Sequence, residues 1–212
     1  WGIKPMSLKA MKVKTKLSLG IGLPLTLMIL VSVLVYSNIQ SMNSTSAWVD
    51  HTHNVLSKAD AIVASAVDME TGMRGFLLTG KEQFLEPYER GQKMAYGQIA
   101  ELQGIVDDNP PQVQRLGKVA AILKEWQQQI TEPMIALRRG ISDLAGLGDL
   151  SNRVGEARGK QYFDQFRALM QEFKQIEQTL MEQRMRENQE TVDETETILI
   201  LSTLLATVLG VI

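Results

Sequence analysis

The feature that most constrains this chain is a run of 21 residues, from Leu17 to Ser37, without a charged side chain. A helix of about 20 apolar residues is long enough to cross the hydrocarbon core of a bilayer. Five lysines and no acidic residue precede the run: Lys4, Lys9, Lys12, Lys14 and Lys16. Because basic flanks stay on the cytoplasmic side, residues 17–37 are predicted to be a transmembrane helix, and residues 1–16 a basic cytoplasmic N-terminus.

A cleaved signal peptide is the alternative interpretation of this run. Signal peptides have a hydrophobic core of about 7–15 residues and a cleavage site of the small-x-small type. The present run is longer, and Val35-Tyr36-Ser37 is a poor cleavage site, so an uncleaved anchor is favoured. Residues 1–10 read poorly as a start, and Met11 is a plausible initiator.

A second apolar run, Thr197 to Ile212, follows the acidic residues Asp193, Glu194 and Glu196. As a helix its 16 residues would measure about 24 Å, which is short of a hydrocarbon core of ~30 Å. We interpret residues 197–212 as a truncated second transmembrane helix, with a buried helix of a soluble domain as the alternative. Residues 38–196 would then form one domain outside the cytoplasm, and two spans around one polar domain suggest a transmembrane receptor.

The composition of residues 38–196 excludes several classes of function. These 159 residues hold 17 Lys and Arg against 24 Asp and Glu, a net charge of −7, which argues against nucleic acid as a partner. Cysteine is absent, and His51 and His53 would diverge on a helix, so they cannot share a metal ion. We find no Gly-rich phosphate loop, no pair of catalytic carboxylates and no nucleophile elbow. No enzymatic activity, catalytic residue, cofactor or metal is therefore predicted.

Apolar periodicity and helix-breaking residues predict four helices in this domain. The first continues from the membrane to about Leu78, where Thr79-Gly80 ends it. The second covers residues 82–106 and the third residues 111–139, separated by the break at residues 107–111. Pro133 should kink or open the third helix. Residues 140–159 hold five glycines and are expected to form a loop or a broken short helix, after which the fourth helix restarts near residues 156–160.

Each predicted helix has an apolar seam that should face a common core. On the first helix, two series with seven-residue spacing define it: Met42, Val49, Leu56, Val63 and Leu77, with Thr45, Thr52, Ala59, Ala66 and Met73. On the second the inward residues are Phe84, Leu85, Tyr88, Ala95, Leu102 and Ile105, and on the third Leu116, Val119, Leu123, Trp126, Ile130 and Leu137. On the fourth they are Phe166, Leu169, Phe173, Ile176 and Leu180.

The predicted helix lengths suggest an elongated all-α, up-down-up-down four-helix bundle between two transmembrane helices. Outside the membrane the first and fourth helices have 41 residues each, but the second and third only 25 and 29. The last ~20 Å above the membrane would therefore contain only two helices per chain. Their seams are polar there and cannot bury a core alone, so we predict a homodimer through the first and fourth helices.

The segment Asp68 to Tyr88 resembles the signature of the third class of CHASE domains, which are extracellular sensory domains of bacterial receptors. The resemblance rests on Glu70, Thr71, Gly72, Arg74, Gly75, Phe76, Leu77, Leu78, Thr79 and Gly80, followed by Phe84, Leu85, Pro87 and Tyr88. Weaker similarity follows at Trp126 with Pro133, and at Gly159-Lys160, Phe166-Arg167, Phe173, Glu177 and Arg184. The N-terminal segment Lys14 to Gly22 resembles the start of methyl-accepting chemotaxis receptors.

This resemblance implies a dimeric sensor in the bacterial inner (cytoplasmic) membrane, multi-pass, with its sensory domain periplasmic or extracellular. It also implies a cytoplasmic output module that this chain lacks: a chemotaxis signalling hairpin, a histidine kinase or a nucleotide cyclase. A chemotaxis receptor is the favoured interpretation. A membrane-anchored structural or adaptor coiled coil is the alternative from another class. The stimulus, a small molecule or a protein, cannot be read from the sequence.

A small network of buried charges is predicted around Glu70. On the heptad pattern Glu70 points inward, where a carboxylate is costly unless paired. Arg74 is its i,i+4 neighbour, and antiparallel packing of the first and fourth helices places Arg167 nearby. Fixing helix register is the favoured role, with direct ligand contact and an exposed pair as alternatives. We expect stimulus detection at the end of the bundle that holds the 79–81 turn and residues 140–159.

Overall fold

The computed structural model describes residues 13–141, 146, 148, 150, 152 and 158–211, and the elements bounded within these ranges are all helical. They are α1 (Val13–Thr79), the 3₁₀ turn η2 (Glu82–Leu85), α2 (Glu86–Ile105), α3 (Pro110–Trp126), the π-helical segment η3 (Gln127–Thr131), α4 (Glu132–Gly140) and α6 (Arg158–Val211). Most of the predicted connection at residues 140–159 lies outside the described residues.

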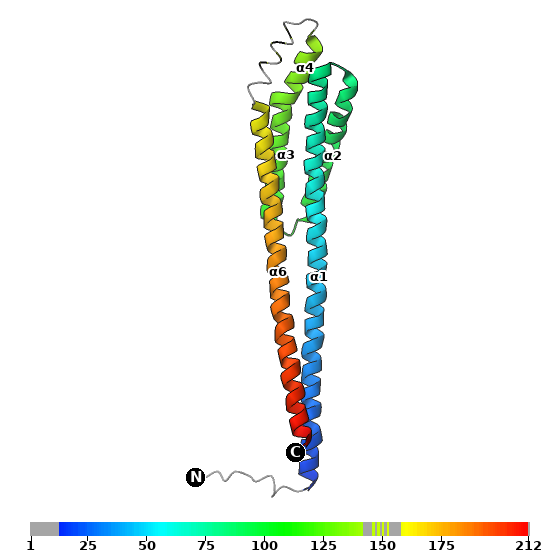
Figure 1. The fold of residues 1–212 in the computed structure, drawn as a ribbon, viewed down its shortest axis with the longest axis vertical. Coiled ribbons are helices and arrows are strands. Elements are labelled where there is room, and N and C mark those ends of the chain that lie inside the picture. Colours follow the sequence, from blue (N-terminus) through cyan, green and yellow to red (C-terminus); the bar gives the residue numbers. More distant parts are fainter. Residues whose placement is uncertain are drawn as a thin grey trace, which may run out of the picture. The chain divides into compact units, whose positions relative to one another are not determined.

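The chain divides into two compact units, and Asp50–Met181 forms the larger one. This unit is a four-helix bundle made of the end of α1, of α2, of α3 with η3 and α4, and of the start of α6. Successive helices run in opposite directions, so the α1–α2 turn and the C-terminal end of α4 lie at the same end of the bundle (Figure 1). The predicted all-α, up-down-up-down bundle is confirmed for this unit.

Glycine and proline set the helix ends where the sequence places them. Gly80 has a φ of 70°, a conformation that L side chains rarely adopt, and its N–H donates to the carbonyl of Phe76 at 2.7 Å. Pro110 opens α3 and thus ends the break after α2. The predicted start of the second helix at Glu82 is partly wrong, because residues Glu82–Leu85 are 3₁₀-helical. Pro87 has no N–H to donate one turn back, so regular α-helix begins only at Glu86.

The third helix is interrupted next to Pro133, as predicted. The five residues Gln127–Thr131 form a π-helical segment just before it, where the N–H of Glu132 donates to the carbonyl of Gln127, five residues back. Because Pro133 cannot donate a backbone hydrogen bond, the regular α-helical ladder is interrupted at this point. The wider π turn changes the rotational phase of α4 relative to α3.

The buried seam of α1 differs from the predicted one in half of its positions. Thr52, Ala59, Ala66 and Met73 are buried as expected, but the residues three positions further along complete the seam: Val55, Ile62, Met69 and Phe76. Of the other predicted series Leu77 is buried, whereas Leu56 and Val63 are only half-buried, so the seam there is centred on Val55 and Ile62 instead. Both series are apolar at heptad spacing, and only the packing of the other three helices decides between them. Glu70 consequently lies beside the seam rather than on it.

The other three seams are largely as predicted. Leu85 of η2 is buried, as are Tyr88, Ala95 and Leu102 of α2, together with Ile99. Phe84 is 38% exposed, which corrects its assignment to the core, and its ring lies over Gly75 at the bundle surface. The predicted α3 and η3 residues from Leu116 to Ile130 are buried, as are Phe166 and Phe173 on α6, while Leu137, Leu169, Ile176 and Leu180 are half-buried.

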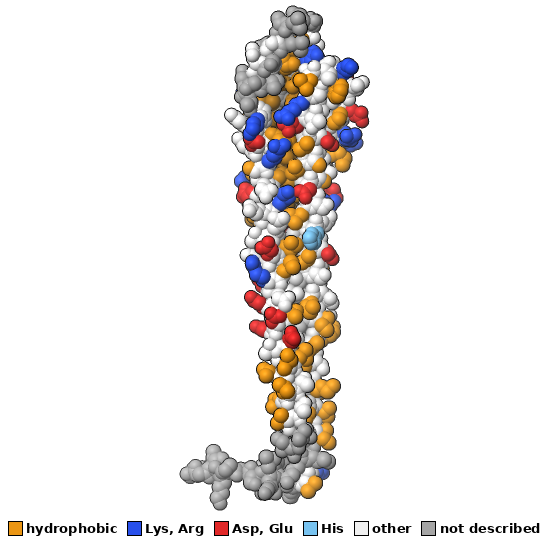
Figure 2. Space-filling model, viewed as in Figure 1, with side chains coloured by type: hydrophobic (Ala, Val, Ile, Leu, Met, Phe, Trp, Pro, Cys, Tyr) orange, Lys and Arg blue, Asp and Glu red, His pale blue; other side chains and the backbone are white. Residues whose placement is uncertain are grey.

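The second unit contains α1 up to Val49 and α6 from Glu182 onward. Large apolar side chains of both helices are exposed in it, including Ile29, Val33, Leu201 and Leu204. Orange apolar surface gathers over this part of the two helices in Figure 2. Within the described part of the chain, one helix, α1, contains a stretch long and apolar enough to cross a membrane, and none of that stretch is buried. Towards the bundle the surface becomes polar, and the guanidinium of Arg184 lies 4.0 Å from the ring centroid of Trp48.

Candidate functional site

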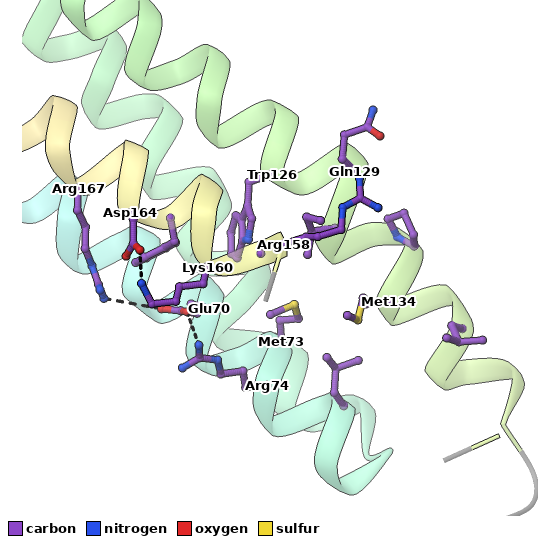
Figure 3. A pocket seen from close by; sticks show the side chains of 16 residues that line it. Glu70, Met73, Arg74, Trp126, Gln129, Met134, Arg158, Lys160, Asp164 and Arg167 are labelled. Atoms are coloured by element: carbon purple, nitrogen blue, oxygen red, sulfur yellow. Dashed lines mark hydrogen bonds and ion pairs between the residues drawn. The ribbon is translucent and has the colours of Figure 1, made fainter. Parts of the chain in front are cut away.

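A cavity of about 450 Å³ lies in the four-helix bundle, between α1, the η3–α4 segment and the start of α6 (Figure 3). Small-molecule sites usually occupy about 300–1,000 Å³. The π turn and Pro133 interrupt the regular third helix at the level of the cavity. Both Pro133 and Ile130 line it.

One side of the cavity is apolar and partly aromatic. Trp126 and Phe163 meet edge to face with their ring centroids 5.5 Å apart. Met73 and Met134 extend this surface from α1 and α4. At Gly159 an added Cβ would lie 3.1 Å from Cγ2 of Ile130, so the backbone of α6 approaches the third helix closely here. This side can accept an aromatic or branched aliphatic group by burying its surface.

The charged side of the cavity is centred on Glu70, and the structure brings the three predicted network residues together there. A carboxylate oxygen of Glu70 lies 2.7 Å from Arg74 Nη2 and the other 3.9 Å from Arg167 Nη2. The Glu70 side chain is only 13% exposed, whereas those of Arg74 and Arg167 are 65% and 53% exposed. The acid is therefore held at the bundle edge, while both guanidinium groups reach solvent and the cavity mouth.

Further charges come from the start of α6. Lys160 pairs with Asp164 one turn later, and Arg167 also stacks over Phe163 at 4.6 Å from its centroid. Arg158 lines the cavity, and no described residue forms an ion pair with it. Among the residues that the structure describes, the charged lining consists of four basic residues and two acidic ones: Arg74, Arg158, Lys160 and Arg167, with Glu70 and Asp164.

A buried polar network lies between α2 and the π turn. The Tyr88 and Thr131 hydroxyls are 2.9 Å apart, and Gln127 Nε2 donates to the Tyr88 hydroxyl at 3.2 Å. Tyr96 donates a short hydrogen bond to Gln127 Oε1. Burial, with smaller contributions from Tyr88 and Glu132, raises the pKa of Tyr96 to about 12. This network fixes the position of η3 and hence the wall of the cavity.

Most of the other residues of the predicted signature build the α1–α2 contact rather than the cavity. An added Cβ at Gly72 would lie 2.6 Å from the backbone nitrogen of Tyr88, and one at Gly75 2.9 Å from Cδ1 of Phe84. Phe76 is buried in the core. The hydroxyl of Thr79 donates to the carbonyl of Gly75 and accepts from the N–H of Lys81, which shapes the turn.

The remaining signature residues have similar structural places. Gly80 lies against Arg138, whose Nε donates to the carbonyl of Leu77 at 3.0 Å. Pro87 is in the first turn of α2, and Thr71 is exposed. Toward the opposite end of the bundle, Gln112 Nε2 donates to buried Glu177 at 2.8 Å. Of the segment Asp68 to Tyr88, the residues Glu70, Met73, Arg74 and Leu77 line the cavity.

Sequence reasoning missed several residues of the site. Arg158, Phe163 and Asp164 line the cavity although nothing singled them out, and Gln127 and Thr131 form the buried network behind it. Polar residues on a helix are ordinarily assigned to its exposed face. The available signal was spacing: Gln127 and Thr131 are four residues apart and share a face with Leu123, which is buried.

Comparison with known families identifies the bundle. The model of the CHASE3 domain matches residues 45–187, which include the whole of the Asp50–Met181 unit. No curated protein and no solved structure gives a significant match to the chain.

Proposed function

The chain belongs to the CHASE3 family of extracytoplasmic sensory domains, and from this premise we propose that it is the sensory half of a bacterial chemotaxis receptor. The CHASE3 domain is the sensory domain of a signalling receptor and has no catalytic role of its own. In the proposal, residues 17–37 and 197–212 are membrane spans, and a cytoplasmic signalling module follows them. The bundle then lies in the periplasm or outside the cell.

The observation that carries this proposal is the continuity of α1. One helix runs from Val13 through the exposed apolar stretch to Thr79 at the cavity end of the bundle. Glu70 and Arg74 on this helix line the cavity. A ligand that moved α1 relative to α6 would shift the helix along its length, because a continuous helix transmits displacement with little loss.

A chemotaxis receptor is favoured over a sensor kinase or cyclase by the N-terminal segment. The lysines and glycines of the segment from Lys14 to Gly22 resemble the start of chemotaxis receptors. The structural or adaptor coiled coil is disfavoured by the cavity, since a spacer needs no charged opening of about 450 Å³ in its bundle.

The proposal is tested with the full-length protein in membranes of cells that lack their own chemotaxis receptors. We expect it to activate the added chemotaxis kinase in the presence of its coupling protein, and to become methylated on glutamates of its cytoplasmic part. Autophosphorylation of the protein from ATP would instead identify a histidine kinase, and formation of cyclic nucleotide a cyclase. Absence of all these activities in a correctly inserted protein would favour the structural interpretation.

A further inference from the structure

We propose that the cavity between α1, η3–α4 and α6 binds a small amphipathic carboxylate with an aromatic or branched aliphatic body. This inference rests on the proposed sensory function and specifies the ligand class of its site. Three features of the cavity support it: the charge of the lining, the guanidinium groups without a close partner, and the apolar side.

The charge of the residues that line the cavity favours a ligand of opposite charge. Residues 38–196 carry 17 basic against 24 acidic residues, yet the described residues that line the cavity include four basic and two acidic ones. On the face shown in Figure 2, basic side chains gather over the part of the bundle formed by the end of α1 and the start of α6. A positive cavity in an acidic domain favours an anion and repels a cation.

Two of the basic groups that line the cavity, both guanidinium groups, have donors available for a ligand. Arg74 is engaged by Glu70 at 2.7 Å and Lys160 by Asp164. Arg167 lies 3.9 Å from Glu70, which is longer than a hydrogen bond, so its donors remain available. Arg158 has no ion-pair partner among the residues that the structure describes. Planar guanidinium groups suit carboxylate recognition because they can donate two parallel hydrogen bonds.

The apolar side of the cavity sets the body of the ligand. The edge-to-face pair of Trp126 and Phe163, with Ile130 and Met134 beside it, offers an apolar surface next to Arg158 and Arg167. Trp126 and Phe163 are each only 2% exposed, so this surface is largely covered already, and a fully hydrophilic anion such as inorganic phosphate would gain no apolar contact with it. A molecule with one carboxylate and one compact apolar group gains that contact and places its charge at the arginines.

The test uses the whole chain in lipid nanodiscs and a defined panel of probes. The panel contains benzoate, 3-phenylpropanoate, indole-3-acetate and 4-methylpentanoate, each with its neutral amide and with inorganic phosphate as a further reference. Binding is measured by calorimetric titration and by the rise in melting temperature, because a ligand that binds only the folded state stabilises it. We expect at least one acid to bind, its amide at least tenfold more weakly, and phosphate not at all.

Three cavity variants and one control variant locate the binding. Arg158→Gln and Arg167→Gln should each weaken the acid at least tenfold, whereas Arg90→Gln, a change at an exposed arginine of α2 outside the cavity, should leave affinity unchanged. Met134→Trp fills the cavity without changing charge and should abolish binding. A circular dichroism melt of each variant shows that it folds.

The proposal is overturned if no acid of the panel binds the folded chain, if amides bind as well as acids, or if Arg90→Gln has the same effect as the cavity variants. These outcomes are separate from failure of the receptor function. A full-length protein that controls the chemotaxis kinase but binds no acid keeps its function and loses only this ligand class. A full-length protein that binds the acids without any output would contradict the receptor proposal alone.

Discussion

At the scale of single residues, the Glu70 ion pairs show how exposure limits the energy of a charge network. The carboxylate is largely buried, but the guanidinium groups of Arg74 and Arg167 are more than half exposed. Removing a partner of a fully buried pair costs about 3–5 kcal/mol, because the remaining charge is left without water. Here both arginines would keep most of their hydration.

We therefore expect Glu70→Ala to lower the free energy of unfolding by about 1 kcal/mol. The matched control is Glu101→Ala, which removes an acid that is 57% exposed and pairs with Lys58 at 2.7 Å. Its effect should stay within about 0.5 kcal/mol. Denaturant unfolding of the two variants makes the comparison, and equal midpoints would show that Glu70 contributes no more than a surface acid.

Tyr96 makes the stability of the bundle depend on pH in the alkaline range. Its folded pKa of about 12 lies above the ordinary value of 10.0, so the unfolded chain loses this proton first. Stability from Tyr96 is complete below pH 10 and falls as the pH rises towards 12. Because its side chain is only half-buried, we expect a loss of about 1 kcal/mol. Melting temperatures between pH 9 and 12 should decline less steeply in Tyr96→Phe than in Tyr162→Phe.

At the scale of helices, glycine allows α1 and α2 to approach one another in the signature segment. A methyl group at Gly72 would meet the backbone of Tyr88 at 2.6 Å, and backbone cannot move aside as a side chain can. Gly72→Ala should destabilise the fold by about 1–3 kcal/mol. Gly104→Ala is the control, since nothing lies within 4 Å of its added Cβ, and it should stabilise α2 by about 0.5–1 kcal/mol. Equal effects in thermal unfolding would contradict the close approach.

Helix number, order and ends could be predicted because they depend on local chemistry. Gly80 and Pro110 act through their own backbone, and Pro133 through the hydrogen bond that it lacks. The seam of α1 could be placed only to within one residue, because Leu56 and Val55 are both apolar at equivalent spacing. Which of the two residues is buried depends on contacts with other helices, and the pattern of a single helix does not contain that information.

The cavity could not be predicted for a related reason. Its walls come from three segments that are far apart in sequence, represented by Met73, Trp126 and Phe163. Their meeting depends on packing between helices, which the pattern of a single helix does not contain. Glu70 was found because the heptad pattern placed a carboxylate on an apolar seam, whereas Arg158 looks like any exposed arginine at a helix start.

At the scale of the whole molecule, the two units have different requirements for partners. The Asp50–Met181 unit buries a continuous core of its own, including Ile62, Leu116 and Phe173. The described residues of the other unit belong to α1 and α6, and on α1 the apolar side chains of Ile39 and Met42 are 49% and 43% exposed among mostly polar neighbours. Two helices bury too little apolar surface to be stable alone, so a second chain is the natural source of the missing contacts.

We therefore predict a parallel homodimer through α1 and α6, which single cysteines can detect. The chain has no cysteine of its own, so cross-links report only the introduced positions. Met42→Cys, Val49→Cys and Leu56→Cys lie at seven-residue spacing on one face of α1 and should form disulfide-linked dimers in oxidised membranes. Ser44→Cys points to the opposite face, about 200° around the helix from Met42, and should remain monomeric. The measurement is non-reducing electrophoresis after mild oxidation. Monomers at all three seam positions, or equal cross-linking at Ser44, would rule out this interface and leave α1 paired only within its own chain.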